Sequence, residues 1–236
     1  MRTVALVPIF LAFVLTLQLP VDAQDPASSW LVYAETQCPE GQTVTRFEGK
    51  WKVGPTPMPS FTYYTPWIGI ETSDNMNLLQ PVNPWDGRHW TAYAEYFQWS
   101  PVNNINSEIY HVPADSVLVG TVTATADYKY EVRIKDLASG IESSQLRKVQ
   151  KDNAGNYKNY TRFYVVYEHH ASSCNLYPSS QEQIFYDLTV ECDGNVVSNP
   201  AWSARSKQPI CDFQSSILNS SAVKITWSTT SSKVLH

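Results

Sequence analysis

The stretch from Trp67 to Trp99 limits the folds open to this chain most strongly, because short apolar runs alternate there with turn residues. Trp67 to Ile70 and Leu78 to Gln80 are apolar runs stopped by polar residues or proline, and Asp86-Gly87 is a turn dipeptide. Tyr93 to Trp99 alternates as a strand does. The stretch therefore predicts three short strands joined by turns, close to a β-meander.

The alternation also assigns side chains to faces, because successive residues on a strand point to opposite sides of the sheet. Leu78 and Gln80 share a face, so the glutamine amide is expected beside apolar surface, where it needs hydrogen-bond partners. This amide either makes a structural hydrogen bond to a loop or is directed at an oxygen that becomes charged during a reaction. On the last strand, one face carries Tyr93, Glu95, Phe97 and Trp99, and the other carries Ala94, Tyr96 and Gln98.

Composition extends the all-β prediction to the rest of the chain. The sequence contains 14 Tyr, 8 Trp and 8 Phe, which are enriched in strands, and it shows no long helical periodicity and no internal repeat. About ten strands are expected, which is typical of a sandwich of two sheets. We expect a single sandwich domain over residues 24–236. Further strands are predicted at Thr43–Val53, Ser116–Ala126, Tyr128–Lys135, Arg162–Glu168, Ile184–Val190 and Ala222–Trp227.

Residues 1–23 have the three parts of a secretory signal peptide. Arg2 gives a positive start, Val4 to Leu19 is apolar but too short to span a bilayer, and Val21-Asp22-Ala23 offers small residues for cleavage. We therefore expect a secreted, extracellular protein that begins near Gln24 and has no membrane anchor after the signal is removed.

The charge of the mature chain argues against a nucleic-acid partner. Cleavage removes one base and one acid, Arg2 and Asp22, so the net charge stays at -5, whereas nucleic-acid binding needs a basic surface. No CxxC or Cys/His spacing suggests zinc. The adjacent His169 and His170 point to opposite faces of a strand and are expected at an exposed strand end. We expect no cofactor, no metal and a monomer.

Secretion makes disulfides the expected state of the four cysteines, Cys38, Cys174, Cys192 and Cys211. Of the three pairings that exist, we favour Cys174–Cys192 with Cys38–Cys211. The first would close a hairpin-sized loop and the second would tie the N-terminal region to the late chain. The sequons that begin at Asn159 and Asn219 predict a glycoprotein with both sites on the surface, if the host is eukaryotic.

A set of motifs follows in fixed order between Thr43 and Val190. They are Phe47-x-Gly49-x-Trp51-x-Val53, Trp67-Ile-Gly-Ile70, Leu79-Gln80, Tyr96-Phe-Gln-Trp-Ser-Pro101, Val112-Pro-Ala-Asp-Ser-Val117 and Phe185–Val190. In this order and spacing they resemble the glutamic peptidases called eqolisins, which are secreted acid proteases. The resemblance implies a concanavalin A-like β-sandwich, a jelly roll of two curved antiparallel sheets.

In that family a glutamate activates a water as general base and later protonates the leaving amine, while a glutamine stabilises the oxyanion. The resemblance assigns the oxyanion role to Gln80. The family strand Ala-Glu-Trp-Ile-Val-Glu, laid on Phe163–Glu168, puts Tyr164 at the catalytic glutamate and Glu168 at the second one. Tyr164 and Glu168 share a face but lie about 13 Å apart. We expect Glu168 to be the general base, brought to Gln80 by a bulge or an even shift of register.

The resemblance also bears on the groove that would hold a substrate. The family tends to carry a carboxylate where this chain has Gln98, and Glu95 is a poor replacement because it points to the opposite face. The residues that we expect to bind substrate are Trp67, Trp90, Tyr96, Gln98, Trp99 and Tyr164.

Two functions stay open, with a third less favoured. The chain is either an acid endopeptidase with Gln80 and Glu168 as its catalytic pair, or a catalytically silent module that binds an extended peptide or a polysaccharide in its concave groove. A retaining glycoside hydrolase needs two carboxylates about 5 to 5.5 Å apart, and the sequence shows no Glu-x-Asp-x-x-Glu arrangement on one strand face. Direct or one-water reach from the Gln80 amide to a carboxylate supports hydrolysis, and a gap above about 7 Å supports binding only.

Overall fold

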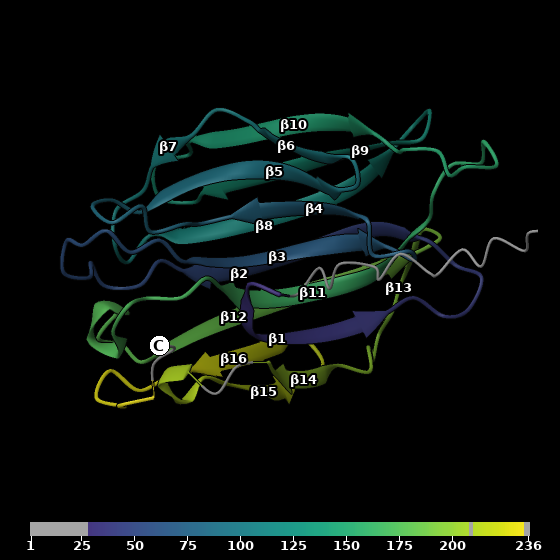
Figure 1. Cartoon of the computed structure of the whole chain (residues 1–236). Helices are drawn as coiled ribbons and strands as arrows, with labels where there is room; N and C mark the ends of the chain where they lie inside the picture. Colours follow the sequence, from purple (N-terminus) through teal and green to yellow (C-terminus); the bar gives the residue numbers. More distant parts are fainter. Residues whose placement is uncertain (1–27, 208–209, 234–236) are drawn as a thin grey trace, which may run out of the picture.

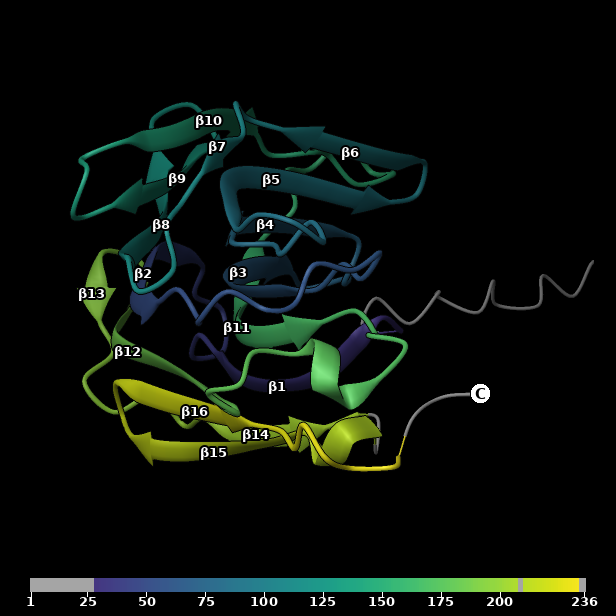
Figure 2. The same ribbon diagram turned by 90° about the vertical axis from the view of Figure 1, so that its left-hand side faces the viewer.

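Two antiparallel β-sheets make up the computed structural model of the chain, which describes residues 28–207 and 210–233. The predicted signal peptide, residues 1–23, lies outside the described residues. The sheets stack as two layers (Figure 2). The predicted all-β sandwich is therefore confirmed.

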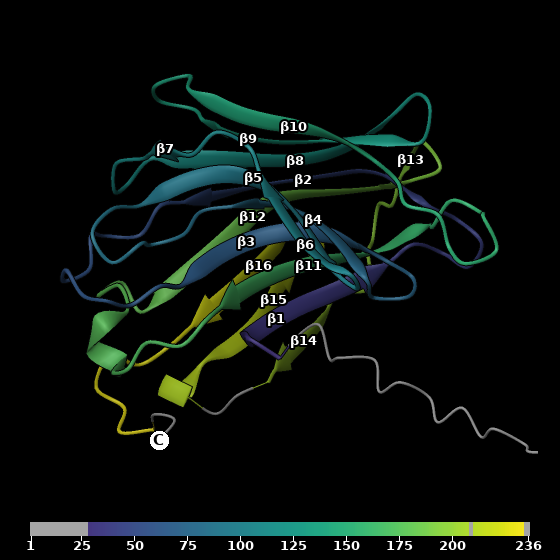
Figure 3. The same cartoon turned by 45° about the horizontal axis from the view of Figure 1, so that its top comes forward.

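Sheet 1 carries most of the segment from which the fold was predicted (Figure 1). Its neighbouring strands are, in order, β14 (Ser203–Ser206), β1 (Trp30–Gln37), β11 (Tyr160–Glu168), β3 (Thr65–Thr72), β4 (Asn77–Val82), β5 (Thr91–Trp99) and β6 (Val102–Asn106), and β7 (Tyr110–His111) pairs with β5. The predicted meander corresponds to β3, β4 and β5. Chain order is broken where β11 lies between β3 and β1 (Figure 3).

Sheet 2 forms the second layer. Its strands are, in order, β10 (Glu142–Lys148), β9 (Lys129–Asp136), β8 (Val117–Thr125), β2 (Val44–Lys52), β12 (Glu182–Cys192), β16 (Ala222–Thr226) and β15 (Gln214–Asn219), and β13 (Asn195–Val196) pairs with β12. The helical content of the described residues is two 3₁₀ turns, η1 (Cys174–Leu176) and η2 (Ile210–Asp212). No helix in residues 28–207 and 210–233 is long and apolar enough to cross a membrane.

The inward-facing residues of both sheets form the main core. Phe47 and Trp51 of β2, Phe185 of β12 and Ile68 of β3 are fully buried there. The rings of Phe47 and Phe163 meet edge to face across the layers, with centroids 5.3 Å apart. Such aromatic pairs add stability beyond the area that they bury.

Pro81 of β4 sets how closely the two sheets approach. A Cβ added to Gly120 of β8 would lie 2.6 Å from Cγ of Pro81, so only glycine permits this contact. Pro81 also has no N–H, so β4 donates no ladder hydrogen bond at this position. This contact fixes the position of β4 at Pro81. Gln80 directly precedes Pro81, and its side chain points to the opposite face of the sheet.

The outer face of sheet 1 carries a second apolar cluster. Buried side chains from five strands, β1, β3, β4, β5 and β11, form it, with Tyr33, Phe97 and Trp99 packed against them at its edge. Its buried members are Trp30, Trp67, Leu78, Val82, Tyr93, Tyr164 and Val166. A face that packs against no second sheet thus carries several aromatic rings, most of them buried.

The disulfides correct the favoured pairing. Cys38, after β1, is bonded to Cys192 at the end of β12, and Cys174 of η1 is bonded to Cys211 of η2. The favoured hairpin bond between Cys174 and Cys192 is wrong because β12 has 11 residues. A strand of that length separates its two ends by about 36 Å. Both sequon asparagines, Asn159 and Asn219, are exposed, as expected.

Candidate active site

A pocket of about 500 Å³ opens on the outer face of sheet 1. Gln80 of β4, Glu95 of β5 and Glu168 of β11 line it together. Segments far apart in the sequence complete its walls, since Ser29 lies before β1 and Asn104 lies on β6. The sheet thus brings one amide and two carboxylates to a single cavity.

Gln80 makes its hydrogen bond with a carboxylate that was not expected to be its partner. The pairing of β4 with β5 sets Gln80 opposite Glu95, and Gln80 Nε2 donates to Glu95 Oε2 at 3.0 Å. The other carboxylate oxygen, Oε1, accepts from Asn104 Nδ2 at 2.6 Å. Gln80 Oε1 is buried and has no hydrogen-bond partner among the described residues. An unpaired acceptor of this kind is costly unless a ligand or water satisfies it.

The electrostatic surroundings favour the protonated form of Glu95. Its side chain is buried, with 8 % of the residue exposed. Burial, followed by the negative charge of Glu168, raises the pKa of the Glu95 carboxyl from its usual 4.5 to about 7, although the hydrogen bonds from Asn104 and Gln80 oppose this. A carboxyl with a pKa near 7 can take up and release a proton near neutral pH, which is what acid–base catalysis requires.

Gly69 leaves the space beside Gln80. Gly69 pairs with Tyr164 on one side, and a Cβ built on Gly69 would lie 2.8 Å from the carbonyl oxygen of Leu79 and 3.0 Å from Cβ of Gln80. Tyr164, Gly69, Gln80 and Glu95 therefore form one row across β11, β3, β4 and β5. The Tyr164 ring packs edge to face on Trp30, with centroids 5.0 Å apart.

Glu168 lines the same pocket but makes other hydrogen bonds. Its Oε1 accepts from Ser29 Oγ at 2.5 Å and its Oε2 from Trp67 Nε1 at 2.8 Å. The pairing of β11 with β3 is regular from Arg162 to Glu168, which places Glu168 opposite Thr65. The expected bulge or register shift that would bring Glu168 to Gln80 is therefore wrong.

A further carboxyl, Glu71 of β3, is buried on the same face of sheet 1, with 1 % of the residue exposed. Neither of its oxygens makes a hydrogen bond of normal geometry among the described residues. Burial raises the pKa of the Glu71 carboxyl to about 8, while Tyr164 and Arg162 lower it to a smaller extent. Glu71 does not line the pocket, so it bears on stability more than on chemistry.

Three of the residues expected to bind substrate lie on the inner face instead. Trp90 packs on Trp85 and Tyr64 in the main core, with ring centroids 5.6 and 5.8 Å away. Tyr96 is also in the main core, and its hydroxyl donates to Gln98 Oε1 at 2.8 Å. The expected groove of Trp90, Tyr96 and Gln98 is therefore wrong, because Tyr96 and Gln98 lie on the inner face of β5, and Trp90, directly before β5, packs in the main core.

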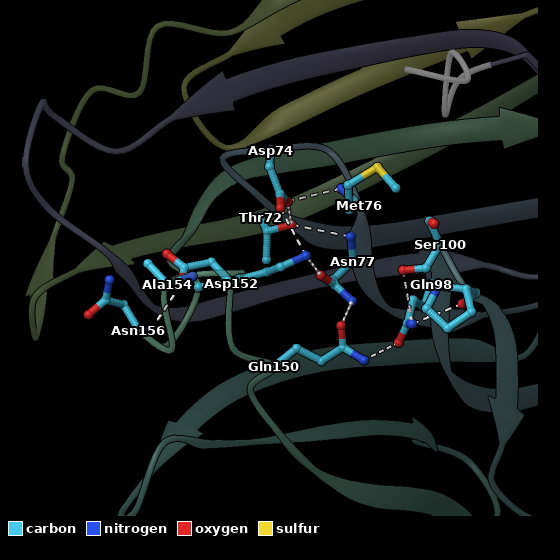
Figure 4. A network of polar contacts seen from close by, with 12 residues as sticks. Thr72, Asp74, Met76, Asn77, Gln98, Ser100, Gln150, Asp152, Ala154 and Asn156 are labelled. Carbon is cyan, nitrogen blue, oxygen red and sulfur yellow. Dashed lines mark hydrogen bonds and ion pairs between the residues drawn. The ribbon is translucent and has the colours of Figure 1, made fainter. Parts of the chain in front are cut away.

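Gln98 has a structural role. Its Nε2 donates to the carbonyl oxygens of Ser100 and Pro101, and its Oε1 accepts from Gln150 (Figure 4). Gln150 also accepts from Asn77 Nδ2 at 3.2 Å. This network ties the segment after β10 to the ends of β4 and β5.

The other expected residues do face outward. Trp99 lines the pocket, Trp67 lies beneath it as the hydrogen-bond donor to Glu168, and Tyr164 packs in the outer cluster. His169, at the end of β11, lines the pocket with its Nε2 3.6 Å from Glu168 Oε1. Among the described residues, no group of three or more His, Cys, Asp or Glu is arranged to hold a metal ion.

Comparison with solved structures identifies the fold. No protein-family model matches the sequence, and a search of curated proteins finds no match. Scytalido-glutamic peptidase with a peptide-based transition state analogue aligns with a TM-score of 0.61 at 17% identity, over 85% of this chain and 98% of that chain. The chain has the eqolisin fold. SCP-B, a member of the eqolisin family solved with the tripeptide Ala-Ile-His, aligns with a TM-score of 0.59 at 18% identity, over 85% of this chain and 98% of that one.

The row of Tyr164, Gly69, Gln80 and Glu95 can be compared with the pattern that the sequence resemblance predicted. The sequence resemblance predicted Tyr164 at the position of the family's catalytic glutamate, and the structure sets Tyr164 across Gly69 from Gln80. A glutamate is instead found on the other side of Gln80, at Glu95. The alternation of Tyr93 to Trp99 already put Glu95 on the face opposite Gln98, but the sequence did not reveal which residue of β4 it meets.

Proposed function

We propose that this protein is a secreted hydrolase of peptide bonds that works through Gln80 and Glu95. The observation that carries the proposal is the 3.0 Å hydrogen bond between the Gln80 amide and a buried carboxylate at a pocket. Direct contact between these groups favours hydrolysis over binding alone. The shared fold with peptidases supports the class of reaction, although it does not assign the residues.

The pair has the groups that peptide hydrolysis needs. Nε2 of Gln80 carries two hydrogens, and the one not given to Glu95 can donate to the oxygen of the scissile carbonyl. Ionised Glu95 takes a proton from water as the water oxygen attacks the carbonyl carbon. When the carbon–nitrogen bond breaks, Glu95 returns that proton to the leaving nitrogen. An amide donor at the oxyanion is worth about 3 kcal/mol in the transition state.

Secretion is part of the proposal. Residues 1–23 have the features of a signal peptide, and the two disulfides suit an oxidising compartment. Mass spectrometry of the protein released by expressing cells tests this, since the mature chain is expected to begin near Gln24.

Cleavage of an unstructured protein between pH 3 and 9 tests the reaction. Gln80→Ala is expected to lower kcat/KM by about a hundredfold or more, and Glu95→Gln by more, because it removes the group that moves the proton. Glu142→Gln, an exposed change on β10, is the matched control and is expected to cleave like the parent. Equal activity in Glu95→Gln and the parent would remove Glu95 from the mechanism.

A catalytically silent binding module is the second candidate. The observation in its favour is Tyr164, which stands where the family resemblance expects the catalytic glutamate. Extended peptide or polysaccharide would then lie against the aromatic rings of the outer cluster. No cleavage at any pH, together with peptide or polysaccharide binding that Trp99→Ala weakens, would favour this function over hydrolysis.

A further inference from the structure

The pocket on sheet 1 is rich in acceptors of hydrogen bonds and poor in positive charge. Two carboxylates, Glu95 and Glu168, and the unpaired Oε1 of Gln80 belong to it. Among the described residues that line it there is no lysine and no arginine, and His169 is the basic side chain. A pocket with this composition is complementary to a ligand that brings hydrogen-bond donors and positive charge.

Among the described residues, the basic side chain beside the two carboxylates is His169, whose Nε2 lies 3.6 Å from Glu168 Oε1, and none forms an ion pair with Glu95. Every hydrogen bond described for Glu95 comes from a neutral amide, and Glu168 accepts from the hydroxyl of Ser29 and the indole of Trp67. Glu168 is close enough to Glu95 for its charge to disfavour ionisation there. Bringing a cation into the pocket would relieve this repulsion.

The walls beside Glu168 suit an ammonium or guanidinium group. Trp30, Tyr63 and Tyr93 line the pocket with it. Aromatic faces attract such cations, most strongly where water is excluded. The stem of a lysine or arginine side chain is apolar and can pack along the same rings.

We propose that the pocket selects peptides that carry an ammonium or guanidinium group, with Glu168 as the specificity-determining carboxylate that receives it. Selective cleavage of such peptides rests on the proposed function, whereas their selective binding does not. Glu95 and Gln80 then act on the peptide bond, and Glu168 acts on the charge of the substrate. In the pairing of β11 with β3, Glu168 lies opposite Thr65 and not in the row of Gln80. Glu168 can therefore bind the charged group while Gln80 binds the peptide bond.

Binding of uncleavable peptides tests the proposal without requiring activity. The probes are N-acetylated hexapeptide amides with a reduced central peptide bond, identical except for lysine, norleucine or glutamate at one position, which is scanned along the peptide. Isothermal titration at pH 7.5 is expected to give a Kd about ten- to a hundredfold lower for the best lysine peptide than for its norleucine counterpart. Norleucine keeps the apolar stem, so the difference reports the charge.

A second arm separates the two sources of an ammonium group. Norleucine peptides with a free N-terminus are compared with their acetylated forms. Tighter binding only with the free N-terminus would assign the site to a chain terminus, and tighter binding only with lysine would assign it to a side chain. Either result supports a cation site. If neither lysine nor the free N-terminus tightens binding, the proposal is overturned.

Variants assign the effect to Glu168. Glu168→Gln is expected to abolish the preference for lysine, while Glu142→Gln and His169→Gln keep it. If Glu168→Gln does not fold, the parent in 1 M NaCl serves instead, where screening is expected to reduce the lysine preference at least severalfold. Equal affinity for lysine and norleucine peptides in the parent, or a preference that survives in folded Glu168→Gln, would refute the proposal. Cleavage without charge preference would refute it and leave the proposed hydrolase standing.

Discussion

Replacing Glu71 by glutamine should remove much of the pH dependence of folding. The pKa of this buried carboxyl rises from 4.5 to about 8 in the folded protein, mainly because of burial. The folded state therefore holds the proton more tightly than the unfolded state. The contribution of Glu71 to stability is fully present below pH 4.5, is lost as the pH rises through the window up to about 8, and then stays constant.

The size of the effect follows from the same values. The difference of about 3.5 in pKa, at about 1.36 kcal/mol for each unit, gives a loss of about 5 kcal/mol from Glu71 between pH 4.5 and pH 9, as an upper bound. Glu95 adds a loss of about 3 kcal/mol that is complete near pH 7. Together these losses are comparable with the whole stability of a typical domain.

Urea denaturation followed by tryptophan fluorescence measures this loss at pH 5 and pH 9. The parent should lose several kcal/mol of unfolding free energy over that range, and Glu71→Gln should keep only the part that belongs to Glu95. The change with pH is compared rather than the absolute stability. The amide introduced at position 71 is uncharged, so any cost of burying it is the same at pH 5 and pH 9. Equal losses in the parent and Glu71→Gln would refute the assignment. Glu142→Gln, on the exposed edge strand, should behave as the parent.

Three further outcomes are expected. Gly69→Ala, whose Cβ would lie 3.0 Å from Cβ of Gln80, should lower kcat/KM about tenfold or more in peptide cleavage. Preserved activity in folded Gly69→Ala would show that Gln80 keeps its position when residue 69 carries a side chain, and would contradict this reasoning. The low-pH limb of kcat/KM should lie near pH 7 if Glu95 is the base, and a limb near pH 4 would exclude it. Replacing Cys38 and Cys192 by serine, which opens a loop spanning 154 residues, should lower the unfolding free energy by about 5 kcal/mol, measured by urea denaturation.

Local pattern was enough to predict nine of the strands, β2, β3, β4, β5, β8, β9, β11, β12 and β16, and the faces of their side chains. It did not predict β1, β10, β14 or β15, whose sequences were not singled out. The alternation in β5 correctly separated Glu95 from Gln98, and the pair Leu78 and Gln80 correctly shares a face. Those inferences need only the period of a strand. The groove was mispredicted because it combined Trp99 with Tyr96 and Gln98, which the rule places on the opposite face of the strand. In the structure that opposite face is the inner one.

Long-range partners could not be predicted in the same way. Glu95 meets Gln80 because of the β4–β5 register, which depends on the whole turn between them, and a slip of one residue would have turned Glu95 away. Ser29 reaches Glu168 because β1 pairs with β11, which is remote in the sequence. The disulfides likewise depend on how the strand ends meet in space and not on the spacing of the cysteines.

The contact of Pro81 with Gly120 links the candidate chemistry to the opposite layer of the molecule. A methyl group added at Gly120 would collide with Pro81, and we expect the resulting shift of β4 to displace the neighbouring Gln80. Part of the precision of the site thus resides in a glycine of sheet 2, and a search for loss-of-function substitutions that stops at the rim of the cavity would miss it.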